Sequence, residues 1–148
     1  MNTPRFEISE QDVVDQYRYV DQLVDHVYYS AKTNYDIVPI LQDHTDAGFS
    51  IHFEDALTRT EEDDNIIYHA SSVTEDKLSR LLTHGVDTIA VDNSADLDIL
   101  ESWLDTNPDQ INVFLRLQRR ENTVETGKHY AYGMGSQQVN EALMRLND

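Results

Sequence analysis

Residues 65–93 read NIIYHASSVTEDKLSRLLTHGVDTIAVDN, a stretch with two short apolar segments on either side of a helical one. The apolar segments, Ile66–His69 and Thr88–Val91, have the length and composition of strands that are buried on both faces. Between them, Thr74 can cap a helix, leucines recur at helical spacing, and Gly85 can end the helix. This order predicts two parallel strands joined by a right-handed helical crossover.

The same alternation continues in both directions and predicts a single α/β domain over residues 1–148. Helices are expected from Ser9 onward, at 35–43, at 54–58, at 74–84, after a cap at Ser94, and at 137–146. A short alternating strand is also expected at Phe6–Ile8. The core is predicted to be a parallel sheet of five strands, at His26–Ala31, Gly48–Ile51, Ile66–His69, Thr88–Val91 and Ile111–Leu117.

Other segments are expected to be turns and loops. Asn107–Asp109 has turn composition, Gly133–Gly135 is predicted to be a turn, and the polar stretch Arg119–Lys128 is predicted to be a loop. The acidic run Glu61–Asp64 is expected to be a solvated loop rather than a cation site.

The charge of the chain is strongly negative. It has 28 acidic residues against 11 lysines and arginines, a formal net charge of −17. A protein that binds the nucleic-acid backbone needs basic surface, so nucleic acid is not expected as a partner. The carboxylates are spread over the whole chain, which favours a halophilic protein adapted to high cytoplasmic salt over an acidic protein from a low-salt cell.

The sequence has no cysteine, so disulfides and thiol chemistry are excluded. No apolar run approaches the roughly 18 residues that a membrane helix needs, so no membrane association is expected. The first ten residues are polar and acidic, unlike a secretory signal, and a cytoplasmic location is expected.

Two basic residues are candidates for a catalytic or binding role because each lies at or near the end of a predicted apolar strand. Lys32 is one of only three lysines and follows the run Val27–Ala31. It is either a surface residue that reaches solvent or an amine that can form a Schiff base with an aldehyde. Arg116 could hold an anion. In parallel α/β folds, ligands bind at the carboxyl ends of the strands, where both residues are expected.

The histidines suggest no metal centre. None of the six lies in an HExxH motif or a comparable cluster, so no metal is expected. His52 and His69 follow strands and could face a pocket, but partly buried polar residues are the simpler prediction. No glycine-rich phosphate loop of the GxGxxG or GxxxxGK[ST] type occurs.

Several segments, in order, resemble the fold-type-III pyridoxal-phosphate-dependent decarboxylases of ornithine, arginine, lysine or diaminopimelate. They are TPRFEIS, VYYSAKTN, AGFSIH, IIYHASS, HGVDTIAVDN, VFLRL and YAYGM. The family has TPxYVYD, YAxKAN, GFDVAS, IIFxGPxK, a strand ending in VDS, LRI and KFG at compatible spacing. The likeness covers nearly the whole chain, and the ordered set is more specific than any single motif.

The resemblance implies the N-terminal part of an eight-stranded βα barrel, so the predicted sheet would be a partial TIM-barrel-like one. In the family, the lysine of YAxKAN forms the internal aldimine with pyridoxal 5′-phosphate, and Lys32 matches it. The arginine of LRI lies beside the cofactor, and Arg116 matches it. Lys32 is therefore the expected catalytic residue, and Lys32 with Arg116 are the expected cofactor-binding residues.

The sequence also departs from the family pattern. The aspartate of GFDVAS is Ser50, the lysine of GPxK falls at Val73, and the alanine-serine pair is His52-Phe53. The later histidine, the phosphate loop, the acid that pairs with the pyridine nitrogen and the C-terminal β-domain have no counterpart in these 148 residues. Cofactor binding is therefore expected to be weak or lost, and decarboxylation by this chain alone is not expected.

Three hypotheses follow. The first is a pyridoxal-phosphate-binding barrel segment of an amino-acid decarboxylase of the ornithine, lysine, arginine or diaminopimelate type, truncated or part of a split enzyme, with a free amino acid as its small-molecule substrate. The second is a non-catalytic homologue that binds a full-length decarboxylase and regulates its assembly. The third is a degraded gene product without activity. Because a barrel of this family needs eight strands, the first two hypotheses predict self-association or a protein partner at the open sheet edges.

Overall fold

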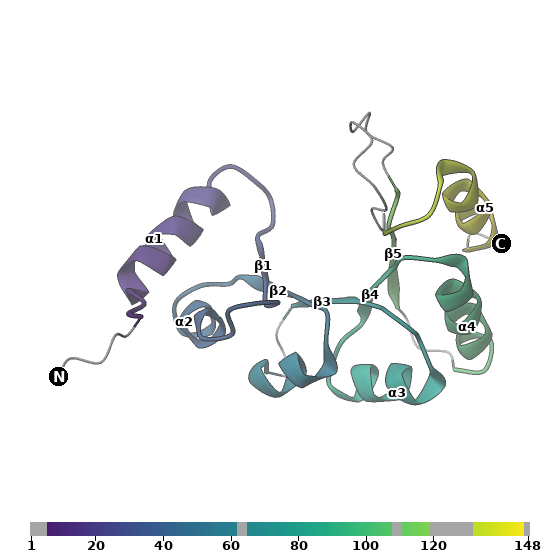
Figure 1. Ribbon diagram of the computed structural model, residues 1–148, viewed down its shortest axis with the longest axis horizontal. Coiled ribbons are helices and arrows are strands. Elements are labelled where there is room, and N and C mark those ends of the chain that lie inside the picture. Colours follow the sequence, from purple (N-terminus) through teal and green to yellow (C-terminus); the bar gives the residue numbers. More distant parts are fainter. Residues whose placement is uncertain (1–5, 62–64, 108–110, 119–131, 147–148) are drawn as a thin grey trace. The chain divides into compact units, whose positions relative to one another are not determined.

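The computed structural model describes residues 6–61, 65–107, 111–118 and 132–146. Five parallel strands alternate with helices and form an open sheet in the order β1-β2-β3-β4-β5, as predicted (Figure 1). The strands are β1 (Tyr28–Ser30), β2 (Gly48–Ile51), β3 (Ile66–His69), β4 (Thr88–Val91) and β5 (Asn112–Leu115). The helices are α1 (Glu10–Asp21), α2 (Ile37–His44), the 3-10 helix η1 (Glu54–Arg59), α3 (Glu75–Thr83), α4 (Ser94–Leu104) and α5 (Ser136–Leu146).

The chain divides into two compact units, residues 1–66 and 67–148. In the first unit, β1 pairs with β2 so that Tyr28 lies opposite Gly48. A Cβ atom on Gly48 would lie 2.5 Å from the Tyr28 ring and 2.9 Å from the carbonyl oxygen of Asn65. Only glycine therefore fits at this point of the strand.

Helix α1 packs against α2 in the first unit. Ser9 caps α1, and its hydroxyl accepts a hydrogen bond from the Asp12 amide at 3.3 Å. Val14 and Tyr17 are buried on α1, and Val38 and Leu41 are buried on α2. The Tyr17 hydroxyl also donates a hydrogen bond to the Asp46 carboxylate at 2.6 Å, which ties α1 to the loop before β2.

In the second unit, β3, β4 and β5 pair in parallel, and all four residues of β4 are buried. Helix α3 contributes Leu78 and Leu81 to the core. The Thr74 hydroxyl caps α3 as predicted, and Gly85 follows the helix in the left-handed conformation, with φ of 86°. Leu97, Leu100 and Trp103 are buried on α4, which contacts both α3 and β4.

Some predicted elements are wrong or too long. Phe6–Ile8 is not a strand, and the Phe6 side chain is fully exposed. Three alternating residues cannot specify a strand without a neighbour that supplies its hydrogen bonds. The strands predicted at His26–Ala31 and Ile111–Leu117 are shorter, at Tyr28–Ser30 and Asn112–Leu115.

Two further details differ from the prediction. Asn93 rather than Ser94 caps α4, because Asn93 has the extended backbone of a cap and its side chain accepts a hydrogen bond from the Asp96 amide. Met134 does not simply lie in a turn. It forms an isolated parallel β-bridge with Leu117, so its backbone pairs with the segment that directly follows β5.

Parts of the predicted loops fall outside the described residues: all of Arg119–Lys128, residues 62–64 of the run Glu61–Asp64, and residues 108 and 109 of Asn107–Asp109. Of the helices that the structure describes, none combines the length and apolar character that crossing a membrane requires.

Candidate functional site

Lys32 lies in the turn that follows β1, two residues beyond the last strand residue, Ser30. Its backbone amide donates to the carbonyl oxygen of Ser30 at 2.9 Å, and its side chain is exposed. Within the described residues, the Lys32 ammonium has no hydrogen-bond or ion-pair partner. The structure therefore places this amine at the carboxyl end of a parallel strand, where a small molecule can reach it.

Lys77 is a second lysine, and its environment is different. Its ammonium donates hydrogen bonds to the carbonyl oxygens of Ser71 and Ser72, at 2.9 and 3.0 Å. Ser72 has a positive φ of 57°, which is uncommon for a residue other than glycine. Lys77 thus holds the loop between β3 and α3 in place, and its amine is already engaged.

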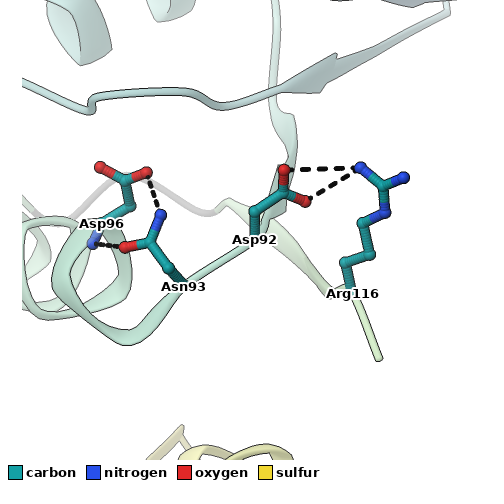
Figure 2. Close-up of polar contacts among 4 residues, drawn as sticks. All are labelled: Asp92, Asn93, Asp96 and Arg116. Atoms are coloured by element: carbon teal, nitrogen blue, oxygen red, sulfur yellow. Dashed lines mark hydrogen bonds and ion pairs between the residues drawn. The ribbon is translucent and has the colours of Figure 1, made fainter. Parts of the chain in front are cut away.

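Arg116 lies in the second unit, directly after β5. Its guanidinium pairs with the Asp92 carboxylate, at 3.3 and 3.4 Å to the two oxygens (Figure 2). The guanidinium also lies over the Tyr132 ring, 5.4 Å from the ring centroid. The arginine side chain is 44% exposed and the aspartate 18% exposed, so the pair is only partly shielded from water.

The strand register explains why Arg116 meets Asp92. Ala90 pairs with Phe114 and Val91 with Leu115, and the Arg116 amide donates to the Val91 carbonyl oxygen at 3.0 Å. Paired residues of neighbouring strands present their side chains to the same face of the sheet, and every second residue of a strand returns to that face. Asp92 lies two residues after Ala90 and Arg116 lies two residues after Phe114, so both belong to the face of the Ala90–Phe114 pair. His69 pairs with Ala90 and belongs to the same face.

Asn93 and Asp96 organise the turn that carries Asp92 (Figure 2). The Asn93 side-chain amide donates to Asp96 at 2.7 Å, and its oxygen accepts from the Asp96 amide at 2.9 Å. Asp96 is buried, and its other carboxylate oxygen accepts from the Val73 amide at 2.7 Å. The two carboxylates therefore have different roles. Asp92 pairs with the Arg116 guanidinium, and Asp96 accepts hydrogen bonds from the Val73 amide and the Asn93 side chain.

The segment before α5 completes the surroundings of Arg116. The Met134 amide donates to the Arg116 carbonyl oxygen at 2.8 Å, and the Gln118 amide donates to the Met134 carbonyl oxygen at 2.8 Å. Gly133 has a φ of 105°, and a Cβ atom there would lie 2.8 Å from the Arg116 oxygen. Arg116 is therefore held through both its backbone and its side chain.

The predicted residues can now be placed. Lys32 belongs to the first unit and Arg116 to the second, and each follows its strand at the carboxyl end, as expected. Ser50 lies on β2, opposite Ser30. His52 and His69 are both half-buried. Among the described residues, no group of three or more His, Asp or Glu side chains is arranged to hold a metal ion.

Sequence reasoning did not identify Asp92, Asp96 or Tyr132. The signal for Asp92 in the sequence was its position directly after the strand Thr88–Val91, but its pairing with Arg116 depends on the register between β4 and β5. Asp96 lies three residues after Asn93, the spacing of a capping box. Tyr132 carried none, because its position over Arg116 depends on the backbone bridge at Met134.

The comparisons with known proteins concern the fold. No family model matches the sequence, and no curated protein matches it either. Among solved structures, the arginine decarboxylase of Paramecium bursaria Chlorella virus matches with a TM-score of 0.67 at 20% identity, over 93% of this chain and 38% of that one. The lysine/ornithine decarboxylase of Vibrio vulnificus, solved with putrescine, matches with a TM-score of 0.69 at 14% identity, over 93% of this chain and 36% of that one.

This chain therefore spans less than two fifths of each of those decarboxylase chains. The expected resemblance to amino-acid decarboxylases is confirmed at the level of the fold: five parallel strands alternating with helices, as in part of the enzymes it matches.

Proposed function

We propose that this chain is a pyridoxal-phosphate-binding barrel segment of the amino-acid decarboxylase type, with Lys32 as the residue that attaches the cofactor. The observation that carries the proposal is the position of Lys32, an exposed amine in the sequence YSAKTN, two residues after the end of the first strand of a decarboxylase-like sheet. Amines at strand ends are suited to covalent capture of an aldehyde.

The residues fit the aldehyde end of the cofactor better than its phosphate. Lys32 has an unengaged side chain within the described residues. Arg116 is the proposed contact for the cofactor, but Asp92 already pairs with its guanidinium and must be displaced or outcompeted by an incoming anion. Weak binding is therefore expected.

The cofactor would supply an electron sink for cleavage at the amino-acid α-carbon. This chain's own residues would bind and orient it: Lys32 by covalent attachment and Arg116 by charge. The proposed substrate is a free amino acid of the ornithine, lysine, arginine or diaminopimelate type. The activity of a complete enzyme would need further strands beyond the five of this sheet.

Covalent labelling tests the proposal. The protein is incubated with pyridoxal phosphate, treated with borohydride to trap any covalent adduct, and mapped by peptide mass spectrometry. Lys32 is expected to carry the label. Lys77 is the matched control within the same chain, because its amine already donates to two carbonyl oxygens. Equal labelling of Lys77 and Lys32, or unchanged labelling in total after Lys32→Arg, would contradict the proposal.

A second candidate is the non-catalytic homologue that binds a full-length decarboxylase and regulates its assembly. The specific observation in its favour is Val73, which stands where the family has a lysine. Val73 is buried, and its amide is bound by Asp96, so this position serves the fold rather than a substrate. Mixing the chain with a purified ornithine decarboxylase separates the candidates: a regulator lowers or raises its activity and co-elutes with it, and a cofactor-binding segment does neither.

A further inference from the structure

The amine of Lys32 is carried by a short loop, residues 31–34, which connects the end of β1 to the turn before α2. Lys32, Thr33 and Asn34 are exposed, so packing against the core does not fix this part of the chain. A lysine amine also stands on a flexible four-carbon stem, and its position depends first on a defined backbone. The hydrogen bonds of the loop therefore decide where the amine can lie.

The backbone just before Lys32 is held by two hydrogen bonds. Ala31 is buried, and its amide donates to the Ser50 carbonyl oxygen of β2 at 3.0 Å. The Lys32 amide donates to the Ser30 carbonyl oxygen at 2.9 Å, a bond between residues two apart, as in a γ-turn. The chain thus turns sharply as it leaves the sheet, and the start of the loop is fixed to β1 and β2.

On the other side of Lys32, the loop is held by a side chain of the strand that it leaves. The Tyr29 hydroxyl donates a hydrogen bond to the Asn34 carbonyl oxygen at 2.9 Å, and Lys32 lies between these two residues in the chain. The Asn34 side-chain oxygen accepts from the Asp36 amide at 3.2 Å, so Asn34 is also fixed to the turn before α2. The bond from Tyr29 therefore closes the loop that carries the amine.

The sheet sets the position of the Tyr29 ring. Tyr29 pairs with Phe49 of β2, and paired residues present their side chains to the same face. Phe49 is fully buried and Tyr29 is half-buried, as is usual for a tyrosine whose ring packs and whose hydroxyl finds a partner. Burial raises the pKa of the Tyr29 hydroxyl above its ordinary 10.0, so the hydroxyl remains a donor at neutral pH.

We propose that Tyr29 is the positioning residue for Lys32: its hydroxyl closes the loop and keeps the amine at the carboxyl end of β1. The inference rests on the proposed function, because it concerns how Lys32 meets the aldehyde of pyridoxal phosphate. In that step the ammonium loses its proton to water, the amine adds to the aldehyde carbon, and the aldehyde oxygen leaves as water when the C=N bond forms. Without the hydroxyl, the loop would sample other conformations and the amine would be aligned with the aldehyde less often.

Two labelling reactions on the intact chain test the inference. The first uses a limiting concentration of pyridoxal phosphate, followed by borohydride, which adds hydride to the C=N bond. The second uses formaldehyde with cyanoborohydride, which methylates any accessible amine and needs no aligned cofactor. Peptide mass spectrometry compares Lys32 with Lys77 in both reactions.

Tyr29→Phe removes the hydroxyl and keeps the ring opposite Phe49. The matched control is Tyr35→Phe, because Tyr35 is also half-buried, directly follows Asn34, and has no hydrogen-bond partner for its hydroxyl within the described part of the chain. The control keeps the Tyr35 ring, over which the Arg59 guanidinium lies. A third variant carries 4-aminophenylalanine at position 29, which places an N–H donor where the tyrosine has its O–H.

Tyr29→Phe should lower the pyridoxal-phosphate labelling of Lys32 about fivefold, the effect expected from the loss of one hydrogen bond. Methylation of Lys32 by formaldehyde should not change, because the amine stays exposed. Tyr35→Phe should match the wild type in both reactions, and 4-aminophenylalanine at position 29 should restore the pyridoxal-phosphate labelling that Tyr29→Phe loses.

The outcomes separate this inference from the proposed function. If Lys32 of the wild type takes no label from pyridoxal phosphate, the proposed function is wrong and the inference falls with it. If Lys32 is labelled equally in the wild type and in Tyr29→Phe, the inference alone is overturned. A parallel change in labelling and methylation would show that Tyr29 controls only the exposure of the amine, which would also overturn the inference.

Discussion

The backbone amide of Val73 donates a 2.7 Å hydrogen bond to the carboxylate of Asp96, which lies 23 residues further along the chain. This bond connects the loop after β3 with the first turn of α4. The same carboxylate accepts from Asn93, so one buried side chain holds two loops of the second unit.

Replacing Asp96 should therefore destabilise the second unit. Asp96→Ala removes two hydrogen bonds to a buried carboxylate and leaves the Val73 amide unpaired, which should lower the free energy of unfolding by about 2–3 kcal/mol. Asp98→Ala is the control, because Asp98 is exposed and pairs with Arg145 on the surface. Its effect should stay below about 1 kcal/mol. Urea denaturation of both variants measures the difference, and equal effects would contradict the assigned role of Asp96.

Two nearby glycines should respond differently to alanine. Gly133 has a positive φ, and an added Cβ would meet the Arg116 carbonyl oxygen at 2.8 Å. Gly133→Ala should cost about 1–3 kcal/mol of stability and loosen the bridge between Met134 and Leu117. At Gly135 the nearest atom to an added Cβ is a side-chain oxygen at 3.6 Å, so Gly135→Ala should be nearly neutral. Thermal melts of both variants measure the difference. A lower melting temperature for Gly135→Ala than for Gly133→Ala would contradict this prediction.

The hydrogen bond between Tyr17 and Asp46 should make stability depend on pH. The Tyr17 hydroxyl lowers the pKa of Asp46 from its ordinary 3.8, so this contribution is present above pH 3.8 and is lost as the pH falls further. Burial, reinforced by Asp46, raises the pKa of Tyr17 above its ordinary 10.0, so that contribution is present below pH 10.0 and is lost as the pH rises further.

Tyr17→Phe should thus be less stable than the wild type between these limits, and the difference should shrink at lower pH. The wild type should lose stability above pH 10.0 more steeply than the variant. Denaturant unfolding across the pH range measures both trends. Tyr19→Phe, at an exposed position of the same helix, should follow the wild type at every pH.

Salt should stabilise the fold. With a net charge of −17, repulsion between carboxylates opposes the compact state, and its range falls from about 10 Å at 0.1 M salt to about 3 Å at 1 M. The melting temperature should rise between these concentrations of sodium chloride. A melting temperature that does not change would mean that the acidic composition has a cause other than adaptation to high salt.

Three of the five predicted strands have the predicted bounds: Gly48–Ile51, Ile66–His69 and Thr88–Val91. Every residue of these strands is buried or half-buried, and each strand is a short, mainly apolar segment whose ends are clear in the sequence. Phe6–Ile8 was wrong, because alternation over three residues does not show whether a partner strand is present. The cap of α4 was misplaced by one residue, because Asn93 and Ser94 are both good caps and only the backbone conformation decides between them.

The positions of the candidate site residues were also predicted, but not their partners. Lys32 and Arg116 follow their strands as expected. The interaction of Arg116 with Asp92 requires the parallel register, which a list of strands does not contain. Its contact with Tyr132 requires the β-bridge between Met134 and Leu117, and no pattern of apolar residues in the sequence predicts that bridge.

The fit between Gly48 and Tyr28 also constrains how this sequence can change over generations. An alanine at position 48 would meet the Tyr28 ring and the Asn65 carbonyl oxygen together. The ring can be removed by a substitution at position 28, but the carbonyl oxygen belongs to the backbone and stays whatever residue occupies position 65. Shrinking Tyr28 first would therefore open only half of the space, so descendants of this chain should keep glycine at position 48 even where the tyrosine has been lost.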